Sequence, residues 1–293
     1  MFLGMGYETI IFLAVSLLFA GAATGFFAGI FGVGGGIIIV PVLYELFRVL
    51  DVAEDVRMPL AVGSSLAIIV PTSIRSFRAH LVKGAVDLEL LKAWAIPVIL
   101  GVIGGSLIAR VAPPAVFKTL FAGIAAFTSF RLLFAKGNWV LKSDMPKGFW
   151  LHAYGLVIGL LSSLMGIGGG QLCNVYMMLY RRPIHQAVAT SSGLGVLISI
   201  PGALGYVYAG WPRMDVLPPL SLGFVSLIGV ALFVPTSMMV VPYGVKLAHR
   251  LPKRKLEVAF GCFLLIVVLR FLWTTLADRK STRLNSSHEW ISR

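Results

Sequence analysis

Two runs of glycine are the residues whose types and spacing suggest binding chemistry. Residues 25–36 read GFFAGIFGVGGG and residues 159–170 read GLLSSLMGIGGG, and the two runs align without gaps. Each glycine costs a helix about 1 kcal/mol relative to alanine, so each run predicts a broken helix. The N-terminus of a half-helix presents backbone N–H groups that can bind an anion. We therefore expect a substrate site formed by Gly34, Gly35, Gly36, Gly168, Gly169 and Gly170.

The same glycines also permit close helix packing. Gly25 with Gly29, and Gly32 with Gly36, have the four-residue spacing that lets membrane helices approach each other. A nucleotide-binding loop is disfavoured, because neither run spells Gly-x-Gly-x-x-Gly or ends in Gly-Lys-Ser/Thr. Anion binding and helix packing both stay open as interpretations.

Neutral polar side chains complete the candidate substrate site. Hydroxyl residues begin the segment that follows each glycine run, and two amides come directly after the second run. Such groups can donate hydrogen bonds to an oxyanion. The alternatives are that the hydroxyls bond to their own helix and that the amides join neighbouring helices. The residues concerned are Ser64, Ser65, Gln171, Asn174, Thr190 and Ser191.

Few charged residues lie inside apolar sequence. Arg75, Arg78 and His80 come closest, and they either extend to the membrane interface or line an anion pathway. A proton relay of carboxylates is disfavoured because no such network is visible. The sequence also has no His-Glu-x-x-His, Gly-x-Ser-x-Gly or Cys/His ligand set, so we expect no enzyme, no metal and no cofactor.

The elements that position these residues are apolar helices. Hydrophobic residues make up 58% of the 293-residue chain, charged residues make up 13%, and the mean hydropathy is +0.90. Apolar segments fall at residues 9–47, 59–79, 93–110, 115–134, 149–179, 186–209, 217–247 and 256–277. The sequence thus predicts an all-α, polytopic transmembrane helix bundle in a lipid bilayer. The net charge is +13, and the basic residues that cause it lie in the short connections between apolar segments. This distribution fits membrane topology rather than nucleic-acid binding.

The segments divide into two groups of four. A polar connection at residues 135–147 separates them, and similar motifs recur in both halves. We expect two homologous four-segment repeats, residues 1–142 and 143–278, each with a broken or re-entrant first helix. Residues 279–293 read RKSTRLNSSHEWISR from Arg279 onward and resemble translated vector sequence, so we expect a non-native tail.

Loop charges distinguish two topologies. If all eight segments cross the bilayer, Lys and Arg divide evenly between its faces. If the first segment of each half folds back at its glycines, these residues favour one side by roughly two to one and the halves become inverted repeats. We expect the second arrangement.

These motifs resemble those of the sulfite exporter TauE/SafE family. The resemblance rests on the paired glycine runs, on AVGSS and AVATSS in the second segments, and on AHLVKGAVD, and it covers residues 10–277. It implies a multi-pass carrier in the bacterial inner membrane that exports sulfite or organosulfonates. For the mechanism we expect alternating access around the two glycine breaks. A passive anion channel is the alternative, and a coupling ion and a homo-oligomer are left open. Tyr206 stands where the first half has His80, so a role for His80 is not duplicated.

Overall fold

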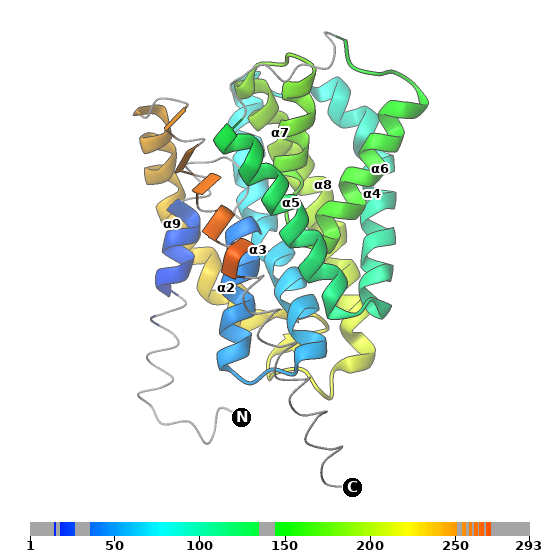
Figure 1. The fold of residues 1–293 in the computed structure, drawn as a ribbon, viewed down its shortest axis with the longest axis vertical. Coiled ribbons are helices and arrows are strands. Elements are labelled where there is room, and N and C mark those ends of the chain that lie inside the picture. Colours follow the sequence, from blue (N-terminus) through cyan, green and yellow to red (C-terminus); the bar gives the residue numbers. More distant parts are fainter. Residues whose placement is uncertain are drawn as a thin grey trace, which may run out of the picture.

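The computed structural model describes residues 15, 18–26, 36–134, 144–250, 254–255, 258–259, 261–262, 264–266 and 268–270. Its helices run side by side in an elongated bundle (Figure 1). The helices that lie wholly within these residues are α2 (Gly36–Val49), α3 (Glu54–Val82), α4 (Leu88–Val111), α5 (Pro114–Phe134), α6 (Phe149–Met165), α7 (Gly170–Leu179), α8 (Ile184–Gly210), η2 (Trp211–Arg213) and α9 (Leu227–Arg250). The described residues therefore agree with a helical bundle. One short antiparallel pair interrupts it, β1 (Ser221–Leu222) with β2 (Val225–Ser226).

Four of the described stretches are long and apolar enough to cross a membrane, namely Glu54–Val82, Leu88–Val111, Gln186–Arg213 and Leu227–Gly244. The outer face of α4 shows which side chains these helices present outside the bundle. Ile96, Leu100, Ile103 and Leu107 follow helical spacing, and all four are exposed, Ile96 by 71%. A soluble protein would bury such a stripe, so this face is suited to lipid.

Glycines bring the inner face of α4 against α6. A Cβ on Gly101 would meet the Leu156 carbonyl oxygen, and a Cβ on Gly159 would meet that of Val98. The two backbones are therefore in contact, which is how small residues allow membrane helices to pack. Trp94 adds a hydrogen bond from its indole N–H to the Leu151 carbonyl, with an N–O distance of 2.8 Å.

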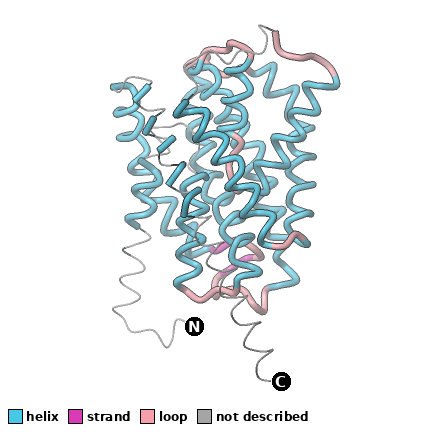
Figure 2. Tube along the Cα trace, in the orientation of Figure 1, coloured by secondary structure: helices cyan, strands magenta, loops and turns pink. Residues whose placement is uncertain are grey.

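The first segment of the second half consists of two helices, α6 and α7, joined by a buried loop. Gly166 ends α6 with φ +67°, and Gly169 precedes α7 with φ +70°. Both angles lie in the left-handed region that glycine adopts without strain. The Ile167 N–H donates to the Ser162 carbonyl at 3.0 Å, which satisfies the end of α6. Figure 2 shows loop backbone at mid-height within the bundle, which agrees with a buried loop between α6 and α7.

In the first half, α2 begins at Gly36, whereas Gly34 and Gly35 lie outside the described residues. Residues 18–26 are helical and pack on α9. A Cβ built on Gly25 would lie 2.5 Å from the Cα of Ser237 on α9. Gly25 thus takes part in close helix packing, which is the second interpretation given above for this run. The polar residues 279–293 also lie outside the described part.

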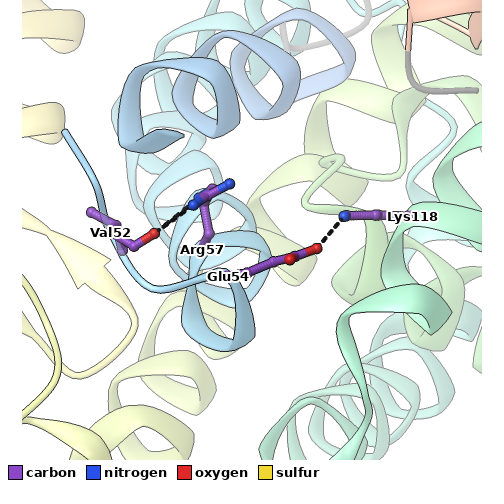
Figure 3. Close-up of polar contacts among 4 residues, drawn as sticks. All are labelled: Val52, Glu54, Arg57 and Lys118. Carbon is purple, nitrogen blue, oxygen red and sulfur yellow. Dashed lines mark hydrogen bonds and ion pairs between the residues drawn. The ribbon is translucent and has the colours of Figure 1, made fainter. Parts of the chain in front are cut away.

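A charged cluster ties three elements together at one end of the bundle. The Lys118 ammonium, on α5, donates to Glu54 Oε1 at 2.9 Å (Figure 3). The same nitrogen lies 5.4 Å from the ring centroid of Tyr44 on α2. Arg57 binds the Val52 carbonyl with two guanidinium nitrogens, at 3.0 and 2.7 Å. These contacts fix the loop between α2 and α3 against α5.

Candidate functional site

The start of α2 lies against the break between α6 and α7. A Cβ built on Gly36 would stand 2.5 Å from the carbonyl oxygen of Gly166 and 2.9 Å from the Cα of Ile167. No side chain separates the two segments at this point. The two glycine runs, which are 134 residues apart in the sequence, therefore meet inside the bundle.

Helices α3 and α8 flank this meeting point. The Ser65 hydroxyl, on α3, donates to the Gly166 carbonyl at 2.8 Å. A Cβ on Gly168 would lie 3.0 Å from Ile69 on α3 and 3.5 Å from the Cα of Gly195 on α8. The break is thus enclosed by the two long helices that cross the centre of the bundle.

Several polar atoms at the break are buried without a hydrogen-bond partner in the structure. They are Ser162 Oγ near the end of α6, Gln171 Nε2 and Oε1 in the first turn of α7, and Asn174 Oδ1 one turn later. Gln171 is only 4% exposed. An unsatisfied buried polar group costs about 1–3 kcal/mol. A cluster of such groups at one place points to a bound ligand or water that completes their hydrogen bonds.

The N-terminus of α7 adds backbone donors to the same place. The Cys173 N–H donates to the Gly169 carbonyl at 3.0 Å, and helix geometry leaves the amides before it without intrahelical partners. The helix dipole places about half a positive charge at this terminus. The residues described at the break carry no formal charge, so the dipole and neutral donors are what an anion would meet.

The other hydroxyl residues of the candidate site are engaged elsewhere. Ser64 Oγ accepts from the Ser226 N–H at 2.8 Å, and so holds β2 against α3. Thr190 Oγ1 accepts from the Asp87 N–H at 2.9 Å, which fixes the loop before α4. Ser191 donates to the Val188 carbonyl of its own helix at 2.9 Å. These three hydroxyls have structural partners, whereas Ser65 binds the break itself.

The pathway candidates lie farther along α3. Arg75 and Arg78 are exposed, and His80 is half-buried in the last turn. Arg75 comes six residues after Ile69, which places it about 9 Å along the helix from the contact with Gly168. Arg75 therefore lies well along α3 from the break, and Arg78 and His80 lie farther along the same helix.

Sequence reasoning missed Ser162 and Gly166. Ser162 belongs to the Ser-Ser pair inside GLLSSLMGIGGG, so a hydroxyl just before the glycines was the available signal. Gly166 is the residue that ends α6, two positions before the three consecutive glycines. Among the residues that the structure describes, no group of His, Cys, Asp and Glu could hold a metal ion.

A membrane-type helix bundle that encloses a helix break and unpartnered polar groups defines the class of multi-pass membrane transporters. Comparison of the sequence with family models agrees with this class. The sulfite exporter TauE/SafE model matches residues 17–271, and the chain belongs to this family. The predicted family and the predicted multi-pass membrane localisation are therefore confirmed.

Curated relatives carry transporter names. A "probable membrane transporter protein" of Haemophilus influenzae is 32% identical over 255 residues, covering 86% of this chain and 95% of the relative. A protein of the same description from Methanocaldococcus jannaschii is 28% identical over 267 residues, covering 87% and 94%. One from Bacillus subtilis is 29% identical over 217 residues, covering 67% and 79%. No solved structure matches the chain significantly.

Proposed function

We propose that this protein exports a small sulfur-containing anion, of the sulfite or organosulfonate kind, through the helix break at Gly166–Gly169. The observation that carries the proposal is the group of buried, unpartnered polar atoms at the N-terminus of α7. A half-helix N-terminus with neutral donors binds an anion without the permanent attraction of a buried cation. The sulfur chemistry and the direction come from the family description, sulfite exporter.

The proposed architecture is a pair of inverted repeats, residues 1–142 and 143–278, each opening with a re-entrant hairpin. Support comes from the second half, where residues 144–148, which precede α6, and the far end of α7 both lie toward the upper end of the bundle in Figure 1. The start of α2 contacts Gly166 from the other half. Re-entrant backbone needs shielding by protein, and the break is buried.

The proposed mechanism is alternating access around this contact, in the cytoplasmic membrane. Rocking of one repeat against the other would open the break to each face in turn. A passive anion channel on the same helices is the alternative. Saturable flux that follows an ion gradient distinguishes the carrier, because a channel conducts without such coupling.

The test is Gly169→Val in the full chain, reconstituted in lipid vesicles. Its Cβ would collide with the Ile198 side chain, and φ of +70° is strained for valine. Gly123→Val on α5 is the matched control, because no atom lies within 4 Å of a Cβ there. Sulfite efflux should be lost in Gly169→Val and kept in Gly123→Val. Equal efflux from both variants would refute the assignment of the site.

A further inference from the structure

The unpartnered atoms at the break are acceptors as well as donors. Gln171 Oε1 and Asn174 Oδ1 are buried carbonyl oxygens, while Gln171 Nε2 and Ser162 Oγ can donate. Gln171 and Asn174 are three residues apart on α7 and therefore share a face of the helix. A Cβ at Gly169 would lie 3.5 Å from Ser162 Oγ, which places that hydroxyl at the same break. Because both ends of the Gln171 amide are unpartnered, the mixture holds for either orientation of the amide.

A ligand that satisfies this mixture must itself donate and accept. A fully deprotonated oxyanion offers acceptors only, so it would leave both carbonyl oxygens unpaired and buried. An oxyanion that keeps one proton also offers a donor. The positive charge available at the break is the partial charge of the N-termini of α7 and α2, which suits one negative charge better than two.

We propose that this site takes its oxyanion in the singly charged, proton-bearing form, as in hydrogen sulfite, and rejects the dianion. The inference rests on the function proposed above and names the form of the substrate that the same site accepts. Discrimination comes from the unpaired carbonyl oxygens, because a site built to receive a donor penalises a ligand that lacks one.

The selecting side chains belong to the second half alone. In the gapless alignment of the glycine runs and the residues that follow them, Ser162, Gln171 and Asn174 correspond to Ala28, Ile37 and Val40. Ile37 and Val40 are buried and apolar. At these three aligned positions the first run therefore has only apolar side chains, and the second run has the polar ones.

Varying the pH changes the protonation of the substrate and can also change that of titratable groups on the surrounding helices, so the two effects must be distinguished. The titratable and charged groups are Cys173 and Tyr176 on α7, Tyr154 on α6, Tyr206 on α8, Asp87 before α4, and Arg75, Arg78 and His80 on α3. A test that varies pH therefore holds the proton-bearing anion constant in one of its arms.

The experiment measures initial sulfite efflux from vesicles containing the full chain, at increasing alkaline pH. With total sulfite constant, the rate should fall about tenfold for each unit of pH, in step with hydrogen sulfite. With hydrogen sulfite held constant by raising total sulfite, the rate should not change. A rate that follows total sulfite in both series overturns the inference but leaves the proposed transport intact. Absence of efflux under every condition overturns both.

Competition gives a second, independent readout. Sulfate carries no proton at these pH values and should inhibit efflux from the wild-type protein only weakly. Asn174→Leu removes one unpaired acceptor, so sulfate should inhibit this variant about tenfold more strongly. The control Val175→Leu changes the neighbouring residue and should leave inhibition as in the wild type. Strong sulfate inhibition of the wild type would contradict the inference.

Discussion

The Ser65 hydroxyl on α3 donates a 2.8 Å hydrogen bond to the carbonyl oxygen of Gly166, which lies 101 residues farther along the chain. Gly166 ends α6 in the left-handed conformation, so this bond attaches a long helix to the broken one. Both partners are buried. The bond therefore fixes the position of the break relative to the centre of the bundle.

Ser65→Ala should lower stability by about 1–3 kcal/mol, because it leaves the Gly166 carbonyl buried and short of one hydrogen bond. Thermal unfolding in detergent, followed by tryptophan fluorescence, measures the change. Ser192→Ala is the control, since the Ser192 hydroxyl donates only to the Ala189 carbonyl of its own helix. Equal losses in the two variants would show that the bond to Gly166 has no special weight.

Gly166→Ala should destabilise the protein by about 1–3 kcal/mol. The added Cβ would lie 2.8 Å from Val40 Cγ2 and 3.0 Å from the Val62 Cα, and φ is +67°. Gly123→Ala meets no atom within 4 Å and should be neutral or stabilising by up to about 1 kcal/mol. The melting temperatures of the two variants should move apart. A Gly166→Ala melting temperature at or above that of the wild type would contradict the tight packing described here.

Gly105→Val should separate α4 from α6. Its Cβ would collide with Ser163 Oγ and would approach the Leu160 carbonyl oxygen to 2.9 Å. The adjacent Gly104 has open space instead, so Gly104→Val should insert and fold normally. Folded yield after size-exclusion chromatography compares the two variants. The prediction fails if Gly105→Val gives the same monodisperse yield as Gly104→Val.

Glu54→Gln should cost more stability than Asp55→Asn. The Lys118 side chain that pairs with Glu54 is only 10% exposed, whereas the Arg213 side chain that pairs with Asp55 is 48% exposed. We expect about 1–2 kcal/mol for Glu54→Gln, because it weakens the pairing of a nearly buried cation, and less than about 1 kcal/mol for Asp55→Asn. Detergent melts at low and high salt measure both. Similar values would show that burial of Lys118 does not strengthen its ion pair.

The membrane class and the family follow from sequence, because hydropathy and the glycine motifs depend on residue type alone. The exact position of the helix break does not follow from the sequence. Residue type allows any of the four glycines at positions 166, 168, 169 and 170 to end a helix, and the left-handed backbone of Gly166, packed against Val40 and Val62, ends α6. Neighbouring residues also diverge for a geometrical reason. Ser64 and Ser65 differ by about 100° around the helix, so one binds β2 and the other binds the break.

The contact between Gly36 and Gly166 limits how the protein can change over evolution. Neither residue has a side chain to shorten, and the nearest atom to an added methyl group on Gly36 is a backbone oxygen. A larger residue at one position therefore has no compensating substitution at the other. Selection for restored activity after Gly36→Ala should recover true reversions but not changes at Gly166, because the added methyl group would stand 2.5 Å from a backbone oxygen. The two glycines are constrained as a pair without being able to co-vary.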